Sequence, residues 1–329
     1  MHKIRWGILS TAKIATKDVI PAMQLGRYSK VVAIASRNKD KAENVADDLG
    51  IEIAYGSYEE LLESKEVDAI YNPLPNHMHV NWSLRALEAG KHVLCEKPLG
   101  MSHTEAQQLL FEAKKHPKLK VMEAFMYRHH PRWVKAKELV QNGAIGELKT
   151  VRTFFSYYSD DPENIRNKPE MGGGSLMDIG CYCISVPRFL FDEEPERVLG
   201  SMEMDPDLNI DRLTSGMMEF PSGSATFTCA TQLAAHQSVD IFGTKGRMRI
   251  PVPFNPPIEI PTVIKLFTED ESENLSIDAC NHYTIQGDLF SEAILEDSEV
   301  PTKLEDGVAN MKVVDAIAKS SREGDWVHC

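Results

Sequence analysis

The chain has 329 residues, 42% of them hydrophobic and 26% charged, as in an ordinary soluble globular protein large enough for two cores. Its 36 basic and 49 acidic residues give a formal net charge of −13. This acidic balance argues against nucleic acid or an anionic membrane as a partner, because both attract basic surfaces. No apolar run approaches the roughly 20 residues of a membrane span, and the first residues resemble a strand rather than a secretion signal.

The six cysteines are dispersed along the chain and form no Cys-x-x-Cys pair. Dispersed thiols without a leader fit a reducing compartment better than a disulfide framework. We therefore expect a cytoplasmic protein.

Residues 1–124 alternate between short apolar strands and helical patterns. The expected strands are Ile4–Leu9, Val31–Ser36, Val67–Asn72, His92–Cys95 and Val121–Phe125. The expected helices between them are Lys13–Gln24, Lys39–Leu49, Tyr58–Ser64, Asn76–Ala89 and His103–His116. Strands buried on both faces and joined by helices predict a doubly wound parallel α/β sheet, a Rossmann dinucleotide-binding domain.

Residues 125–329 have a different pattern, which predicts an α+β domain for substrate binding and oligomerisation. The expected strands are Glu147–Tyr158, Ser215–Phe220, Ser224–Thr231, Ser238–Phe242 and Arg247–Pro251, and the five prolines of 251–262 indicate a loop. Helices are expected at Ser175–Leu190, Thr284–Leu295 and Lys303–Ser321, the last two free to pack back on the first domain. Turn residues between the strands favour an open, mainly antiparallel sheet with helices on one face.

The turn after the first strand is the first candidate cofactor site. A dinucleotide fingerprint, G-x-G-x-x-G/A, would place Ser10, Ala12 and Ala15 at its three small positions, with Thr11, Lys13 and Ile14 between them. Small residues let the backbone approach a pyrophosphate at a helix N-terminus. Two glycines of the fingerprint are replaced, so an ordinary strand-to-helix turn is an equal alternative.

The end of the second strand bears on the choice between NADP and NAD. An NAD site usually has a carboxylate there for the ribose 2′-hydroxyl. This chain has Ser36 and Arg37, with Lys41 nearby, and these donors suit a 2′-phosphate. We favour NADP as the cofactor, with NAD as the alternative. If these residues bind no cofactor, they would form a solvated turn that caps a helix.

Two further segments follow later strands, where parallel sheets bind ligands. Pro73, Asn76 and His79 lie after the fourth expected strand, where Asn76 would N-cap a helix and the loop would follow the nicotinamide ribose. No carboxylate or cysteine completes a ligand set around the histidines, so we expect no metal. Glu96, Lys97 and Pro98 follow the next strand, and the alternative for Lys97 is an ordinary loop lysine.

A glycine-rich turn, Gly172-Gly-Gly-Ser175, precedes Asp178 and Tyr182. Ser175 can cap the helix, on which Asp178 and Tyr182 are four residues apart and share a face. A carboxylate and a phenol near a lysine suit carbinol or carbonyl chemistry, because the lysine lowers the phenol's pKa and aids proton exchange. From spacing alone, a half-buried helix with an Asp–Tyr hydrogen bond is the simpler interpretation.

Together these residues resemble the Gfo/Idh/MocA oxidoreductases over essentially the whole chain. The blocks that match in order are the opening strand-turn-helix, Ser36-Arg37, Pro75-Asn76-x-x-His79, Glu96-Lys97-Pro98, Glu123–Pro131 and the glycine-rich turn leading to Asp178-Ile-Gly-x-Tyr182. Glu-Lys-Pro together with Asp-x-Gly-x-Tyr is fairly specific. Tyr182 replaces a histidine of many members and points to the branch of D-xylose dehydrogenase, dimeric dihydrodiol dehydrogenase and glucose–fructose oxidoreductase.

The resemblance implies a role for each matched residue. Lys97 would be the catalytic lysine with Glu96 in support, and the Lys97–Pro98 peptide is often cis in relatives. Tyr182 would be the acid/base, and Asp178 would orient a substrate hydroxyl. Residues lining the substrate side would be Arg128, His130, Arg166 and Tyr182.

The resulting prediction is an NADP-dependent oxidoreductase that transfers a hydride between the nicotinamide and the carbinol or carbonyl carbon of an aldose or related polyol. The alternatives are a glycosidase that uses a held nicotinamide for transient oxidation and a non-catalytic NADP-binding regulator. The open sheet face predicts a homodimer or a dimer of dimers.

Overall fold

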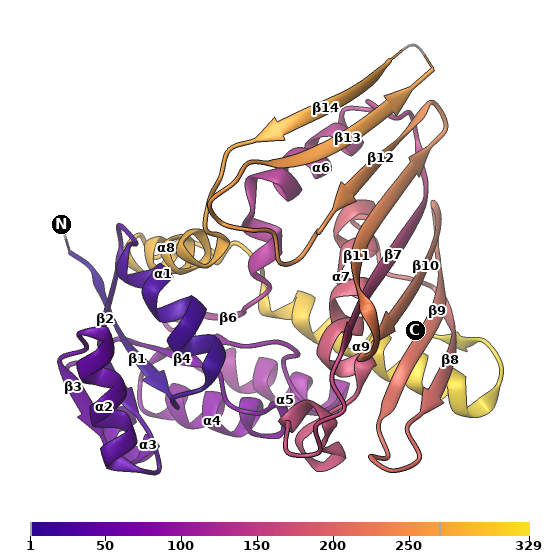
Figure 1. Cartoon of the computed structure of the whole chain (residues 1–329). Helices are drawn as coiled ribbons and strands as arrows, with labels where there is room; N and C mark the ends of the chain where they lie inside the picture. The colour runs from indigo at the N-terminus through magenta and orange to yellow at the C-terminus, as the bar shows by residue number, and fades with distance from the viewer. Residues whose placement is uncertain (1, 270) are drawn as a thin grey trace. The chain divides into compact units, whose positions relative to one another are not determined.

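The computed structural model describes residues 2–269 and 271–329 (Figure 1). Contacts within the chain define two compact units. The first comprises Met1–Met126 and Asn281–Val308, and the second comprises Tyr127–Cys280 and Ala309–Cys329. The chain therefore leaves the first unit after Met126, builds most of the second, returns to the first at Asn281, and ends in the second.

The described part of the first unit contains a six-stranded sheet in which every pairing is parallel. Its strand order is β3 (Ile53–Tyr55), β2 (Ser29–Ala35), β1 (Ile4–Leu9), β4 (Ala69–Asn72), β5 (His92–Cys95) and β6 (Val121–Glu123). The order 3-2-1-4-5-6 is that of a doubly wound dinucleotide-binding sheet, whose ligands lie beyond the carboxyl ends near the β1–β4 switch point. The Rossmann prediction is confirmed, although the short strand β3 was not predicted.

Helices connect these strands, as the alternating pattern predicts (Figure 1). They are η1 (Ala15–Val19), α1 (Ile20–Gln24), α2 (Lys39–Leu49), α3 (Tyr58–Glu63), α4 (Asn76–Glu88) and α5 (His103–Ala113). A later helix, α8 (His282–Leu295), packs on the same sheet, where Trp6 Nε1 donates a 3.0 Å hydrogen bond to Ser291 Oγ. Fully buried side chains such as Trp6, Tyr71 and Phe290 form this core, so residues from the distant end of the chain complete it.

The expectation that Asn76 caps α4 is wrong. Pro75 occupies the N-cap position and Asn76 is the first helical residue. Proline preorganises its own φ for entry into a helix, so α4 begins without a side-chain cap.

The described residues of the second unit form a nine-stranded mixed sheet. Its order is β14 (Ser272–Ile277), β13 (Thr262–Thr268), β12 (Gly246–Pro251), β11 (Gln232–Gly243), β7 (Leu148–Tyr158), β10 (Gly223–Ala230), β9 (Asp211–Phe220), β8 (Arg197–Met204) and β15 (Val327–His328). Among the pairings described, β7 with β10 is parallel and the rest are antiparallel. The prediction of a mainly antiparallel sheet is confirmed; strands β8, β13, β14 and β15 were not predicted.

Helices cover one face of this sheet (Figure 1). They are α6 (Pro131–Gln141), η5 (Leu176–Gly180), α7 (Cys181–Phe191) and the later part of α9 (Leu304–Glu323), with short turns η2 (Met126–His129), η3 (Ile165–Asn167) and η4 (Pro169–Met171). On β10, Ala225, Phe227 and Cys229 are buried while Thr226 is exposed, so the strand alternates between a covered and an open face. No helix in the described part of the chain is both long enough and apolar enough to cross a membrane.

Candidate functional site

Four predicted cofactor segments lie at one edge of the first sheet. Ser10–Ile14 follow β1, Ser36 and Arg37 follow β2, Pro73–Asn76 follow β4, and Glu96 and Lys97 follow β5. These four strands are consecutive neighbours in the sheet and run parallel, so their carboxyl ends share an edge. Segments up to about 90 residues apart in sequence are thereby collected where a doubly wound sheet binds its ligand.

In the turn after β1, Ser10 adopts a backbone conformation that is typical of glycine. Ser10 has φ of 88°, in the left-handed region that glycine adopts without strain. Its hydroxyl accepts a 3.0 Å hydrogen bond from the amide of Ala12, which holds the turn. The helix that follows leads into η1 at Ala15, and Thr11, Ala12 and Ile14 remain partly accessible while Lys13 is exposed. This small-residue turn before a helix fits a pyrophosphate.

The end of β2 presents donors and no carboxylate. Ser36 is nearly buried, and its hydroxyl accepts a 3.2 Å bond from the amide of Asn38. Asn38 caps α2 by accepting a bond from the amide of Lys41. Arg37 is exposed, and its guanidinium lies against the hydroxyl of Tyr58, whose pKa is raised mainly by burial and lowered in part by Arg37. The turn therefore caps α2, as the alternative interpretation predicts, and it also exposes Arg37.

The loop after β4 is joined to the loop after β5 by His79. Its Nδ1 lies 2.7 Å from the carbonyl oxygen of Pro98 and its Nε2 lies 2.6 Å from that of Leu74. The ring is buried, and burial lowers its pKa to about 4, so it is neutral at pH 7. His79 thus holds two predicted segments together rather than projecting from them, while Pro73 is buried and Asn76 is partly accessible.

Glu96 and Lys97 are half-buried at the end of β5. The hydroxyl of Tyr71, on β4, donates a 2.6 Å hydrogen bond to Glu96 Oε1. The peptide bond between Lys97 and Pro98 is cis, in agreement with the resemblance described above. The neighbouring strand therefore fixes the carboxylate beside the lysine.

In the second unit, the carboxylate of Asp178 binds two side chains from different elements. Tyr157, on β7, donates a 2.6 Å bond to Oδ2, and Arg166 Nε, on η3, donates a 3.0 Å bond to Oδ1. Asp178 is 8% exposed, so it is a buried carboxylate with a cationic partner. Its placement on η5 is as predicted, but its partners were not.

Tyr182 lies one turn further along, at the start of α7, among aromatic rings. The centroids of Phe254, Phe155 and Tyr127 lie 5.1, 5.9 and 5.9 Å from its own. Tyr182 is 5% exposed, so packing restricts the orientation of its ring.

Two of the other predicted substrate residues are buried. Arg128 donates from Nε and Nη2 to the hydroxyl of Ser185 at 3.1 and 2.7 Å. His130 accepts a 3.0 Å bond from the amide of Arg132 at the start of α6, and Cys280 Sγ lies 3.5 Å from its Nε2. Desolvation lowers the pKa of His130 to about 4. Arg166 differs from both because its side chain is 45% exposed.

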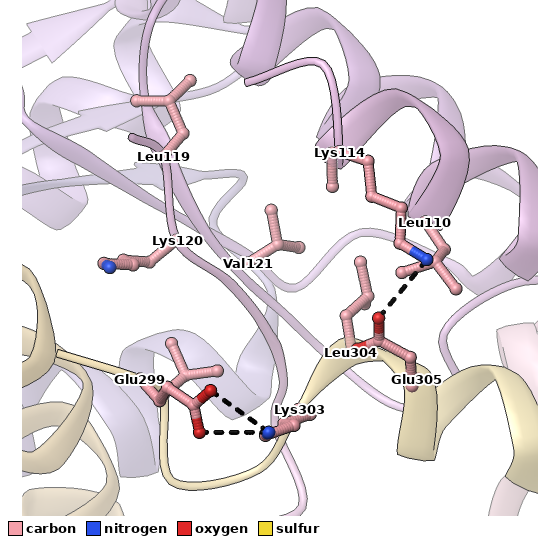
Figure 2. Close-up of a pocket in the computed structure, with 11 residues that line it drawn as sticks. Leu110, Lys114, Leu119, Lys120, Val121, Glu299, Lys303, Leu304 and Glu305 are labelled. Atoms are coloured by element: carbon pink, nitrogen blue, oxygen red, sulfur yellow. Dashed lines mark hydrogen bonds and ion pairs between the residues drawn. The ribbon is translucent and has the colours of Figure 1, made fainter. Parts of the chain in front are cut away.

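A separate pocket of about 320 Å³ lies between α5, the start of β6 and the beginning of α9 (Figure 2). Leucines and valines line it, and the ion pairs of Lys114 with Glu305 and Lys303 with Glu299 cross its rim. Because it adjoins the amino end of β6, it is at the opposite edge of the sheet from the predicted cofactor segments. In the described ranges, no group of three or more His, Cys, Asp or Glu side chains is arranged to hold a metal ion.

Three residues next to the predicted site were missed by sequence reasoning: Tyr71, Tyr157 and Asp211. The hydroxyl of Tyr71 donates to Glu96, and that of Tyr157 donates to Asp178. Asp211, on β9, binds the amide of Leu176 at 2.7 Å and the hydroxyl of Ser175 at 2.6 Å. The expectation that Ser175 caps the helix is therefore wrong, because a carboxylate from the sheet makes the cap. The residues around a tyrosine or an aspartate in a strand do not indicate which distant side chain it will contact in the fold, so the sequence could not predict these bonds.

Comparison with family models gives two matches that together cover much of the chain. Residues 4–125 match the model described as "Oxidoreductase family, NAD-binding Rossmann fold". Residues 133–249 match the model of the Gfo/Idh/MocA C-terminal domain. The two matches fall on the parallel and the mixed sheet, respectively.

Individual proteins are similar over nearly the full length. D-xylose 1-dehydrogenase (NADP(+)) 2 of Haloferax volcanii is 37% identical, covering 97% of this chain and 98% of its own. A 3-ketoreductase from Actinomadura kijaniata, solved with NADP and TDP-benzene, has a TM-score of 0.91 at 30% identity. The match covers 97% of this chain and 98% of the ketoreductase chain. An aldose-aldose oxidoreductase from Caulobacter crescentus, solved with glycerol, has a TM-score of 0.92 at 27% identity, covering 100% of both chains.

Proposed function

The chain belongs to the Gfo/Idh/MocA oxidoreductase family, and from this premise we propose an NADP-dependent enzyme that acts on an aldose or related polyol. The observation that carries this proposal is the 37% identity to an NADP-dependent D-xylose dehydrogenase over 97% of the chain. The structural likeness to an aldose-aldose oxidoreductase supports the same substrate class. The reacting carbon is a carbinol or carbonyl carbon, with C1 of the sugar as our choice.

We assign the cofactor to the carboxyl edge of the parallel sheet, because the residues there fit NADP. Ser10–Ile14 would hold the pyrophosphate, and Pro73, Asn76, His79 and Glu96 would shape the nicotinamide end. Ser36, Arg37 and Lys41 would bind the 2′-phosphate, since a guanidinium and an ammonium attract a dianion. The absence of a carboxylate at the end of β2 favours NADP over NAD.

The proposed reaction transfers a proton and a hydride, each of which is exchanged with a different group. When bound, NADP+ would accept the hydride at C4 of its nicotinamide during oxidation of the substrate, and NADPH would supply it during reduction. In the oxidation direction, Tyr182 takes the proton of the substrate hydroxyl, and it returns a proton in reduction. Lys97 would orient the reacting oxygen and favour the tyrosinate, with Glu96 holding the lysine. Asp178 would orient a further hydroxyl, and Arg128, His130 and Arg166 would belong to the substrate side.

One assay tests this proposal directly. Nicotinamide absorbance is followed with NADP and with NAD across a panel of aldoses, inositols, dihydrodiols and glycosides. We expect NADP reduction with one or more aldoses, or oxidation of NADPH by the corresponding carbonyl compound. Cleavage of a glycoside without net NADP turnover would instead support the redox glycosidase, and NADP binding without any turnover would support the regulator.

Two variants test the residue roles in the same assay. Lys97→Met and Tyr182→Phe should each lower kcat by roughly 100- to 10,000-fold, the usual contribution of a positioned acid or base. NADP binding, measured by fluorescence, and the melting temperature should stay close to the parent for Tyr182→Phe. Full activity in Lys97→Met would exclude the assigned role of that lysine.

We also propose a cytoplasmic homodimer or dimer of dimers that uses the open face of the nine-stranded sheet. Thr226 on this face is opposite Met217 and Arg152 on neighbouring strands, and Met217 is 38% exposed. An extended sheet face of this kind suits a two-fold interface. Light scattering coupled to gel filtration should give a mass of at least twice 36.9 kDa. Met217→Lys should shift that mass towards the monomer.

A further inference from the structure

We infer that Arg132 is a positioning residue for Tyr182 and that it acts through Phe254. The Arg132 guanidinium binds the carbonyl oxygens of residues 251–253, which directly precede Phe254. The ring of Phe254 packs against the ring of Tyr182, with their centroids 5.1 Å apart. All of these residues belong to the second unit. The inference rests on the proposed role of Tyr182 as the group that exchanges the substrate proton.

The first turn of α6 donates hydrogen bonds to three successive carbonyl oxygens. Arg132 Nη1 donates a 3.0 Å bond to Pro251. Its Nη2 donates to Val252 at 2.8 Å and to Pro253 at 3.2 Å. The neighbouring Trp133 donates from Nε1 to Pro253 at 2.9 Å. Both donors are buried, and an arginine holds its N–H groups in a rigid planar fork, so these bonds fix the direction of the segment as well as its distance from α6.

The segment depends on outside donors because its own backbone offers few hydrogen bonds. Pro251 and Pro253 have no amide hydrogen. The amide of Val252 donates to the carbonyl oxygen of Gln237 over 3.4 Å. Val252 has φ of 44°, a left-handed conformation that is strained for a β-branched residue. Its side chain is 42% exposed, so burial of the valine does little to offset this strain. Contacts from elsewhere in the fold must hold the turn, and Arg132 supplies three of them.

Phe254 follows this turn and packs among aromatic rings. It is fully buried, and its amide donates a 3.2 Å bond to Gln237 Oε1. Its ring stacks on Phe155 at 5.0 Å and meets the ring of Tyr127 edge-on at 5.5 Å. Of the ring contacts described for Tyr182, the one with Phe254 is the shortest. Because protein interiors are closely packed, a displaced Phe254 would open space beside Tyr182 and loosen the orientation of the phenol.

The charge of Arg132 is costly to bury, and no ion pair offsets the cost. Among the residues that the structure describes, no carboxylate pairs with Arg132, and its Nε has no hydrogen-bond partner. Burial lowers the pKa of Arg132 to about 10, so the guanidinium stays charged at pH 7. A methionine at this position would remove the cost of burying a charge and would also remove the three bonds. Arg132→Met therefore tests the geometry of the segment.

The first experiment follows the ring signal of Tyr182 in the full-length protein without cofactor or substrate. Tyrosine rings are labelled with carbon-13, and the NMR signal lost in Tyr182→Phe identifies Tyr182. We expect Arg132→Met and Phe254→Leu each to shift this signal, because both change the aromatic packing around the phenol. The double variant should give the same signal as Phe254→Leu alone, since the arginine acts through the phenylalanine. A general loss of stability would lower the melting temperature without producing this pattern.

The second experiment compares kcat with KM in the same variants. With D-xylose, or with the aldose of the panel that is oxidised fastest, each single variant should lower kcat by about 10- to 100-fold, the effect of a misplaced catalytic group. KM for NADP should stay close to the parent value. The double variant should lose no more activity than the more damaged single variant. Arg132→Lys keeps the charge without the planar fork, so its kcat should be intermediate, and it serves as the test if Arg132→Met does not fold.

Lys135→Met is the matched control, because it removes a partly exposed cation from the same helix. It should leave the Tyr182 signal and kcat unchanged. An unchanged Tyr182 signal in Arg132→Met overturns the inference, and so does a double variant in which the two losses of kcat multiply. If the parent transfers no hydride but the Tyr182 signal responds as expected, the proposed function is refuted while the positioning of Tyr182 by Arg132 stands.

Discussion

The hydroxyl of Ser175 donates a 2.6 Å hydrogen bond to Oδ2 of Asp211, which also accepts a 2.7 Å bond from the amide of Leu176. A strand of the sheet therefore caps the helix that carries Asp178 and leads into Tyr182. Thr214 donates to the same oxygen at 2.6 Å, so three donors depend on one buried carboxylate. The positions of Asp178 and Tyr182 therefore depend on the register of β9 in its sheet.

Asp211→Ala should lower the free energy of unfolding by about 2–4 kcal/mol, because it leaves buried donors without an acceptor. It should also lower kcat/KM, since η5 loses its anchor. Urea denaturation and steady-state kinetics measure the two effects. Asp207→Ala, an exposed carboxylate in the nearby loop, is the control and should change stability by less than about 0.5 kcal/mol. Equal stability of the two variants would contradict the capping role.

Arg37→Ala should raise KM for NADP by about 10- to 100-fold and leave KM for NAD nearly unchanged, because a charge-assisted pair with the 2′-phosphate is lost. Arg27→Ala is the matched control, since Arg27 is an exposed arginine before the amino end of β2. Initial rates with each cofactor measure both constants. An equal rise of KM for NADP and NAD in Arg37→Ala would refute the 2′-phosphate assignment.

Ser10→Gly should keep or raise the melting temperature, because glycine adopts φ of 88° without the strain of a side chain. Ser10→Val should lower the free energy of unfolding by about 1–3 kcal/mol, since a β-branched residue is disfavoured there and the bond to the Ala12 amide is lost. Calorimetry compares the three proteins. A Ser10→Val variant as stable as the parent would show that the turn relaxes away from the left-handed region.

The protein should lose stability on acidification between about pH 6.5 and pH 4. Burial lowers the pKa of His79, His92, His129 and His130 to about 4, against an unfolded value near 6.5. The unfolded chain then binds more protons than the folded one, so the free energy of unfolding falls as pH falls through this window. Each group contributes up to about 1.4 kcal/mol per pH unit.

His92→Gln separates one of these groups from the others. His92 Nδ1 accepts a 2.9 Å bond from the amide of Lys120, which requires the unprotonated nitrogen. The variant should show a shallower dependence of melting temperature on pH between 6.5 and 4. His2→Gln, at an exposed site, should leave the slope of the parent unchanged. An unaltered slope in His92→Gln would contradict the proposed titration.

The local patterns predicted many element boundaries well. Ile4–Leu9 and His92–Cys95 match the observed strands, and Lys39–Leu49 matches α2. Buried parallel strands are continuous apolar runs, and three of the connecting helices, α2, α3 and α5, begin at a side-chain cap, so these elements can be recognised from neighbouring residues. Strand β14 was missed because it is the edge strand of its sheet and is largely accessible, which weakens its apolar alternation. Strand β13, next to it, is only partly buried.

The sequence by itself determined the family, the two sheet types and the identity of the residues proposed for chemistry, because motifs and periodicity are local properties of a chain. Only the tertiary structure decided what holds those residues: Tyr71 beside Glu96, Tyr157 and Arg166 beside Asp178, and Asp211 beneath Ser175. Such contacts join strands and turns far apart in sequence. Their geometry arises from strand order and register, which no short pattern of residues encodes.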